Sequence, residues 1–304
     1  MSHSISSTRR HFMKHCAAGA GSLYVASAMG AIRNPLSFAD EEPAVSGAQY
    51  RLGICDWTMG IRCDTSAFQQ AKDLGFDGIQ LTFDPVGETN LREETTRQTF
   101  LAEAERTDCA IASLAMGILN SRPFADDPDS EKWVDDCIDV MAGMEQKQVL
   151  LAFFGAGDLK DRPDKEALAI ERLKRLAPKA ERLGKLLAIE SYLNADEHLR
   201  IIDAVGSDAI RVYYDVANMT TKGYDIFEEI DRLGSKGLIS QVHLKENGER
   251  FGEGVIDFPK VRRSLDAIEY QGWLIAEGGT KGDRDESLRQ NAAYAREVFG
   301  LATE

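Results

Sequence analysis

Short apolar runs alternate with longer stretches of helical periodicity from Tyr50 to near the C-terminus. Runs such as VLLAFF and LLAI lack polar alternation, which is typical of parallel strands that are buried on both faces. We predict eight strands, each followed by a helix. The predicted strands are 51–56, 78–83, 110–116, 149–153, 186–190, 210–215, 239–245 and 273–277. The predicted helices are 65–74, 93–107, 130–144, 165–183, 195–205, 224–233, 259–268 and 285–298.

Glycines support this division of the chain. Gly75, Gly184 and Gly272 each follow a predicted helix, where a residue free to adopt positive φ commonly ends it. Eight strands that alternate with eight helices predict a single-domain (β/α)₈ TIM barrel. An open doubly wound sheet is the alternative fold, but no G-x-G-x-x-G motif follows the first strand.

The first 39 residues have the three parts of an export signal. Arg9 and Arg10 stand in STRRHFMK, an Ala- and Gly-rich apolar run covers 16–32, and small residues for cleavage occur at 37–39. The paired arginines resemble a twin-arginine signal peptide. We therefore predict export to the periplasm or the extracellular space, with the barrel in 40–304. The apolar run is too short and too rich in Gly for a permanent membrane span.

The chain is acidic, with a net charge of −14 over 304 residues. This charge argues against nucleic acid and anionic membranes as partners, and it leaves a homo-oligomer open. Among the cysteines, Cys55 and Cys63 are close enough in sequence to pair across a loop, which the sequence leaves undecided. Cys109 and Cys137 lie among apolar residues and are predicted to be buried free thiols.

Four chemically active residues end four consecutive predicted strands: Glu190, Asp215, His243 and Glu277. They are separated by 25, 28 and 34 residues, and one strand-plus-helix unit of such a barrel takes about 31. Their side chains should therefore meet at the C-terminal mouth of the barrel. Three carboxylates with one imidazole suit one divalent ion such as Mn²⁺, Mg²⁺ or Co²⁺.

Each of the four also has an ordinary structural explanation. Glu190 or Glu277 alone can cap the next helix or pair with a lysine, and Asp215 can be the usual acid of a strand-to-helix turn. His243 alone can be a core histidine with both nitrogens bonded. The occurrence of all four at consecutive strand ends favours the metal site, because active sites of these barrels lie on that face.

Three segments of the last third carry a family resemblance: VHLKE at 242–246, GEGVIDF at 252–258 and YQGWLIAE at 270–277. They resemble the C-terminal signature of the xylose isomerase-like sugar isomerase/epimerase superfamily. Its relatives include ketose 3-epimerases, hydroxypyruvate isomerases, inosose dehydratases and endonuclease IV. The resemblance extends from Tyr50 to the C-terminus and is weak over the first hundred residues of the body. It implies that all four residues bind one divalent metal and that Glu190 and Glu277 exchange protons with the substrate.

This residue set suits chemistry next to a carbonyl group. Removal of a proton there leaves an enediolate, whose charge a divalent cation stabilises as a Lewis acid. Two carboxylates can take the proton from one face and return it on the other, which gives epimerisation; return to the adjacent carbon gives isomerisation. We predict a sugar isomerase or epimerase. The alternatives are a lyase or hydratase that eliminates from 3-keto-glycosides or inososes, and a non-catalytic sugar-binding barrel.

Four further residues are candidates for contact with a carbohydrate or polyol substrate. Lys245 shares the parity of His243 on its strand, so it either projects to the mouth or pairs with a neighbouring glutamate. Asn218 stands where ketose epimerases often carry a histidine, a departure that favours the lyase alternative. Arg250 lies one residue from the position of a substrate-binding arginine in that branch. Trp57 either stacks on a sugar or closes the barrel.

The sequence lacks the residues needed for three other kinds of active site. Outside the predicted leader, His198 and His243 are the only histidines, too few for the three-zinc site of endonuclease IV. No phosphate-binding P-loop and no G-x-S-x-G nucleophile motif occurs in the chain.

Overall fold

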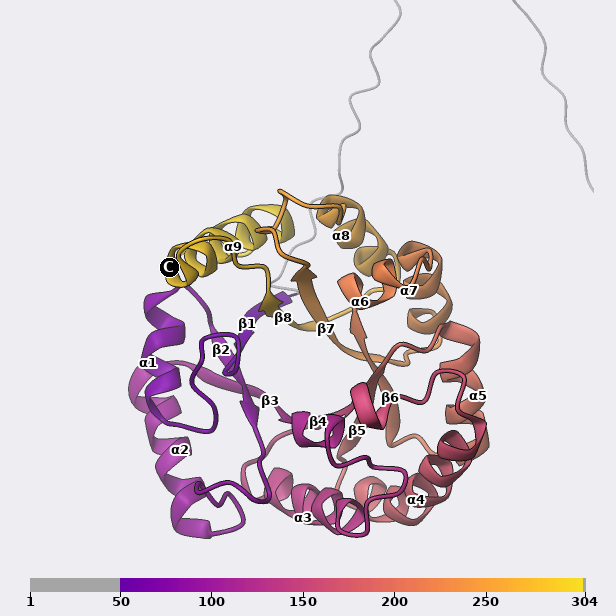
Figure 1. Cartoon of the computed structure of the whole chain (residues 1–304). Coiled ribbons are helices and arrows are strands. Elements are labelled where there is room, and N and C mark those ends of the chain that lie inside the picture. The colour runs from indigo at the N-terminus through magenta and orange to yellow at the C-terminus, as the bar shows by residue number, and fades with distance from the viewer. Residues whose placement is uncertain (1–49, 303–304) are drawn as a thin grey trace, which may run out of the picture. The chain divides into compact units, whose positions relative to one another are not determined.

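Eight parallel strands pair in sequence order, and β1 pairs with β8 to close a barrel (Figure 1). The structure is a computed structural model that describes residues 50–302. The predicted export signal lies outside the described residues. The strands are β1 (Tyr50–Cys55), β2 (Gly78–Thr82), β3 (Ala110–Met116), β4 (Gln148–Phe153), β5 (Leu186–Ser191), β6 (Ile210–Asp215), β7 (Ile239–Glu246) and β8 (Gly272–Gly278).

Helices form the outer ring around this barrel (Figure 1). Within residues 50–302 they are α1 (Ser66–Asp73), α2 (Glu94–Thr107), α3 (Ser130–Gly143), α4 (Pro163–Arg182), α5 (Ala195–Val205), α6 (Val216–Thr221), α7 (Ile226–Gly234), α8 (Phe258–Ala267) and α9 (Arg284–Phe299). Two 3₁₀ helices, Gly117–Asn120 and Gly155–Gly157, follow β3 and β4. The predicted TIM barrel is confirmed, and each predicted strand lies within one residue of its observed bounds. No helix of the described part is long and apolar enough to span a membrane.

The short helix α6 was not predicted. It follows β6 directly, and its first residue Val216 comes straight after the candidate ligand Asp215. The carboxylate of Asp215 accepts hydrogen bonds from the backbone N–H groups of Ala217 and Asn218, which starts the helix. A six-residue helix has too few turns to show a periodic pattern in the sequence.

Helix α5 begins at a complete capping box. The Asn194 side chain accepts from the Glu197 backbone N–H, while the Glu197 carboxylate accepts from the Asn194 N–H. Gly206 ends the helix in the left-handed conformation at φ 70°. The capping box fixes where α5 begins after β5, and so it helps to position Glu190 at the end of that strand.

The four cysteines of the described part are buried and unpaired. This confirms the prediction for Cys109 and Cys137. Cys55 lies inside the barrel on β1, and Cys63 lies in the loop that follows. The disulfide between Cys55 and Cys63 that the sequence left open is therefore absent.

His198 on α5 should make the fold sensitive to acid. It is 1% exposed, and burial lowers its pKa to about 4 from an ordinary 6.5. Between these values the unfolded chain binds a proton that the folded chain does not, so stability is complete above pH 6.5 and is lost as the pH falls toward 4. The loss should reach about 3 kcal/mol.

This expectation can be measured by urea unfolding across that pH range, with His198→Gln as the comparison. The wild-type free energy of unfolding should fall more steeply with acid than that of the variant. Parallel curves would show that another group is responsible.

Candidate metal centre

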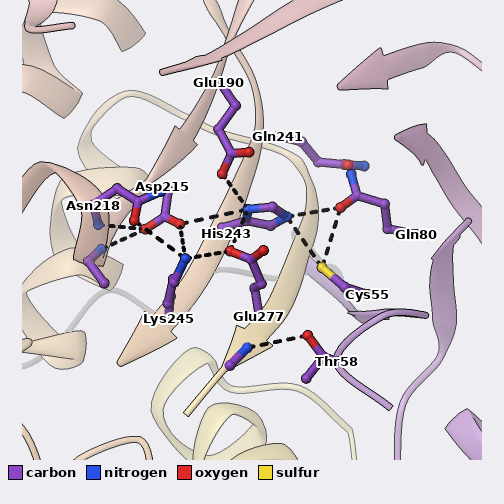
Figure 2. Close-up of polar contacts among 12 residues, drawn as sticks. Cys55, Thr58, Gln80, Glu190, Asp215, Asn218, Gln241, His243, Lys245 and Glu277 are labelled. Atoms are coloured by element: carbon purple, nitrogen blue, oxygen red, sulfur yellow. Dashed lines mark hydrogen bonds and ion pairs between the residues drawn. The ribbon is translucent and has the colours of Figure 1, made fainter. Parts of the chain in front are cut away.

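The four predicted residues at the ends of β5, β6, β7 and β8 converge (Figure 2). Each of Glu190, Asp215, His243 and Glu277 offers one ligand atom, and these atoms lie within 4.8 Å of one another. The Nδ1 atom of His243 is 2.8 Å from Glu190 Oε1 and 3.5 Å from Glu277 Oε2. It is also 3.9 Å from Asp215 Oδ2. Four ligand atoms from four strands thus face a common point.

The two oxygens of Asp215 have different environments. Oδ1 accepts the two backbone hydrogen bonds that start α6, each 2.8 Å long. Oδ2 is buried, accepts no hydrogen bond and lies 3.3 Å from Lys245 Nζ. Asp215 is therefore both the helix-capping acid and a carboxylate with one oxygen free to bind a cation. A buried carboxylate oxygen without a hydrogen bond is costly unless a positive charge is near.

The donor set fits a hard divalent cation. Three carboxylates and one imidazole nitrogen match the ligands preferred by Mg²⁺, Mn²⁺ and similar ions, while no thiolate is among them. Burial raises the pKa of Glu190, and it raises that of Asp215 to about 7. A divalent cation bound here would favour the ionised form of both carboxylates.

Glu277 is held from two sides. Its Oε1 accepts a 2.9 Å hydrogen bond from Trp57 Nε1, and its Oε2 accepts a 2.8 Å bond from Lys245 Nζ. Burial alone would raise the pKa of Glu277, but the charges of His243 and Lys245 and these two hydrogen bonds outweigh it and lower the pKa to about 2. Glu277 is therefore ionised, and Trp57 contacts this carboxylate directly.

Lys245 stands between two of the candidate ligands. Its Nζ lies 2.8 Å from Glu277 and 3.3 Å from Asp215, with Asn218 Oδ1 at 3.4 Å. The salt bridge to Glu277 that the sequence left as one alternative is present. Because its ammonium occupies the space beside oxygens that would bind a cation, Lys245 should compete with that cation.

We therefore expect Lys245→Met to bind Mn²⁺ about tenfold more tightly than the wild type, which corresponds to about 1.4 kcal/mol. Calorimetric titration measures the difference. Lys174→Met is the matched control, because the Lys174 ammonium lies 3.6 Å from Glu171 on α4 and does not line the cavity. Weaker binding by Lys245→Met would mean that the bond by which Lys245 holds Glu277 outweighs this competition.

A cavity of about 770 Å³ opens above this group at the barrel mouth. Of the predicted residues, it is lined by Trp57, Glu190, Asn218, Lys245 and Glu277. The sequence reasoning missed its lining from the first half of the barrel. These residues include Arg62, Asp64, Asp84, Glu88 and Phe154. Tyr192, which follows β5, also lines the cavity and was missed as well.

Arg250 is placed elsewhere. Its guanidinium donates to Ser287 Oγ and to the Lys281 carbonyl, each at 3.2 Å, and it lies 3.6 Å from the Glu253 carboxylate. It is not among the residues that line the cavity. These bonds join the loop after β7 to the start of α9.

The second ring nitrogen of His243, Nε2, contacts residues that the sequence reasoning also missed. Nε2 lies 2.9 Å from Gln80 Oε1 and 3.4 Å from Cys55 Sγ (Figure 2). Gln80 is fully buried on β2 within the run GIQLT. The Gln80 amide between the apolar residues Ile79 and Leu81 was the sequence feature that could have indicated a polar contact inside the barrel.

Residues 68–298 match the sequence profile of the xylose isomerase-like TIM barrel family. The chain belongs to this family. No functionally curated protein matches the sequence significantly.

Solved structures place this xylose isomerase-like barrel beside several sugar epimerases. The 3-keto-D-glucoside 4-epimerase of E. coli superposes with a TM-score of 0.69 at 16% identity, over 82% of this chain and 99% of that one. A D-psicose 3-epimerase from Clostridium cellulolyticum H10, solved with D-tagatose, gives 0.69 at 16% identity over 82% and 99%. A family member from Mycobacterium smegmatis in complex with magnesium gives 0.62 at 20% identity over 78% and 89%. At these identities the likeness concerns the fold.

Proposed function

We propose that this xylose isomerase-like barrel is a metal-dependent sugar isomerase or epimerase. The observation that carries the proposal is the pair of carboxylates, Glu190 and Glu277, within a candidate metal site on the floor of a cavity. They come from β5 and β8, and Figure 2 shows them on either side of the His243 ring edge. The solved neighbours that are named as sugar epimerases support the same reaction class.

Proton transfer next to a carbonyl explains this arrangement. One carboxylate takes the proton from the substrate carbon, and the other, in its acid form, returns a proton on the opposite face. A divalent cation held by Glu190, Asp215, His243 and Glu277 would stabilise the negative charge that develops on the substrate. Trp57 and Lys245 orient Glu277 through their hydrogen bonds, so its carboxylate faces the substrate in one position.

The cavity favours an uncharged carbohydrate. Its walls carry the carboxylates of Asp64, Asp84 and Glu88 against the single guanidinium of Arg62. The remaining cation of the lining, Lys245, is already paired with two carboxylates. A phosphorylated sugar would be repelled by this excess of negative charge.

Two observations favour elimination from 3-keto-glycosides or inososes as the second candidate. The cavity volume of about 770 Å³ falls in the range that holds drug-sized ligands, which leaves room for a substituent beyond one sugar ring. Phe154 and Tyr192 form an edge-to-face pair, with centroids 4.7 Å apart, on its wall. An aromatic pair of this kind can pack against a sugar or its leaving group.

Incubation of the Mn²⁺-loaded protein in D₂O distinguishes these functions. The substrates are free ketoses, inososes, 3-keto-glycosides and, for comparison, sugar phosphates. Deuterium incorporation and product mass are followed together. Deuterium in a product of unchanged connectivity is the expected result, whereas release of an aglycone or of water would assign a lyase.

A lack of exchange with every substrate, in protein shown to contain metal, would overturn the enzymatic proposal in favour of a sugar-binding barrel. The metal-free protein serves as the control, since residual exchange there would show that the cation is dispensable.

We also propose that the chain is exported by the twin-arginine route, on the basis of Arg9 and Arg10 and the apolar run after them. Fractionation of cells that express the full chain tests this. Replacement of both arginines by lysine should retain the protein in the cytoplasm. Unchanged export of that variant would contradict the proposal.

A further inference from the structure

A continuous chain of hydrogen bonds crosses the barrel interior beneath His243. Gln80 Oε1 lies 2.9 Å from His243 Nε2, and the Gln80 amide nitrogen donates to Ser113 Oγ at 3.0 Å. Ser113 Oγ donates to Gln241 Oε1 at 2.7 Å, and the Gln241 amide nitrogen donates to the Ala112 carbonyl at 3.1 Å. Gln80, Ser113 and Gln241 are each at most 1% exposed.

The positions of these residues on their strands explain why Gln80, Ser113 and Gln241 meet inside the barrel. Gln80 on β2 and Ser113 on β3 are register partners, so their side chains lie next to each other inside the barrel. Gln241 precedes His243 by two residues on β7 and therefore projects from the same face of that strand. It reaches Ser113 from β7, 128 residues further along the chain. The polar side chains thus form a layer beneath the metal site.

The donor and acceptor of every hydrogen bond in this series follow from its last group, the Ala112 carbonyl. The Ala112 carbonyl can only accept, so Gln241 must present its NH₂ group there and its oxygen to Ser113. The Ser113 hydroxyl then donates to Gln241, which leaves its oxygen to accept from the NH₂ group of Gln80. Gln80 consequently presents its oxygen to His243 Nε2.

We propose that Gln80, Ser113 and Gln241 are positioning residues that keep a proton on Nε2 of His243 and so leave Nδ1 as the metal-binding nitrogen. Nδ1 is the ring atom that faces Glu190, Asp215 and Glu277. Protein groups that bond the outer nitrogen of a metal-binding histidine commonly fix its tautomer in this way. The inference rests on the metal centre of the proposed function, but it concerns binding and not turnover.

Cys55 agrees with this assignment. Its sulfur lies 3.4 Å from both Gln80 Oε1 and His243 Nε2. The thiol is placed to donate to the Gln80 oxygen. Gln80 Oε1 thus has the thiol as a donor, and an inverted amide would turn its NH₂ group toward that donor instead.

His198 provides an internal reference for the opposite tautomer. Its Nδ1 lies 3.1 Å from the Asn194 carbonyl, which can only accept, so Nδ1 carries the proton. Its Nε2 lies 3.0 Å from Ser191 Oγ, whose hydroxyl donates to it. The two histidines of the described residues should therefore give opposite patterns in one spectrum.

The first measurement is a long-range ¹H–¹⁵N correlation spectrum of the full-length ¹⁵N-labelled protein loaded with Mg²⁺. His243 signals are identified by their loss in His243→Gln, and His198 signals by their loss in His198→Gln. A protonated Nε2 on His243 with a protonated Nδ1 on His198 is expected. A protonated Nδ1 on His243 would overturn the inference, and this result needs no substitution in the polar layer.

The second measurement is calorimetric Mn²⁺ affinity in variants of the layer. Gln80→Met should weaken binding by about 10- to 100-fold. Ser113→Ala, one bond further from His243, should weaken it by less than Gln80→Met does. Gln80→Glu keeps an acceptor toward Nε2 but loses the donor to Ser113, so its affinity should exceed that of Gln80→Met. Ser130→Ala removes another fully buried hydroxyl, which bonds only to backbone carbonyls and Arg172 far from the site, and should not change the affinity.

Equal loss of affinity in Gln80→Met and Gln80→Glu would show that Gln80 acts only through packing and would overturn the inference. Unchanged affinity in both Gln80→Met and Ser113→Ala would do the same. A protein that shows the expected tautomers and affinities but no turnover would contradict only the proposed function.

Discussion

Glu277→Gln should lower kcat by about 10³-fold or more while the barrel stays folded, because an amide cannot exchange the proton that a carboxylate exchanges. The substitution keeps the side-chain shape, and the remaining oxygen can still accept from Trp57 Nε1. Glu190→Gln should have an effect of similar size, since both carboxylates take part in the proposed transfer. The rate is measured with the best substrate found by deuterium exchange, and folding by circular dichroism.

Glu171→Gln is a suitable control for the amide substitution. Glu171 is exposed on α4, where it lies 3.6 Å from Lys174, and should leave kcat unchanged. Metal content has to be measured alongside, because Glu277 is also a candidate ligand. A metal-loaded Glu277→Gln variant that turns over at the wild-type rate would disprove the proton-exchange role.

The second large effect concerns metal binding. His243→Ala removes the only nitrogen ligand and the group that bridges the carboxylates to the polar layer below. We expect Mn²⁺ affinity to fall by at least about 100-fold, more than the loss typical of an outer-shell substitution. Elemental analysis after dialysis at low metal concentration measures this as lost occupancy.

His198→Gln is the matched histidine control for that experiment. His198 is also fully buried, but its nitrogens bond to Asn194 and Ser191 and not to the candidate ligands. Its metal stoichiometry should equal that of the wild type. Unchanged stoichiometry in His243→Ala would mean that the ligands lie elsewhere in the chain.

The four residues at the ends of β5 to β8 could be predicted from the sequence because the fold is a parallel barrel. Its strands are buried on both faces, so they read as apolar runs, and a charged residue at the end of such a run is conspicuous. Glu190, Asp215, His243 and Glu277 could be found in this way. Their convergence followed from the fold, since the C-terminal ends of all eight strands meet at one face.

The polar layer could not be predicted on the same basis. Gln80, Ser113 and Gln241 lie inside strands, where a single polar residue does not reveal its partner. The bond from Ser113 to Gln241 connects β3 to β7, which are not neighbours in the sheet, and depends on side-chain reach within the closed barrel. The cavity lining from the first half of the barrel was missed because loop residues such as Arg62 and Glu88 follow no periodic pattern.

Because the barrel closes between β1 and β8, the metal site is completed only late in synthesis of the chain. Trp57, just after β1, donates to Glu277 at the end of β8, a contact between residues 220 positions apart. The ribosome makes β1 first and β8 last, so a nascent chain lacks both the fourth ligand and the strand that covers the free edge of β1. Metal loading should therefore require a fully translated chain, and premature termination before β8 would leave an open sheet prone to aggregate.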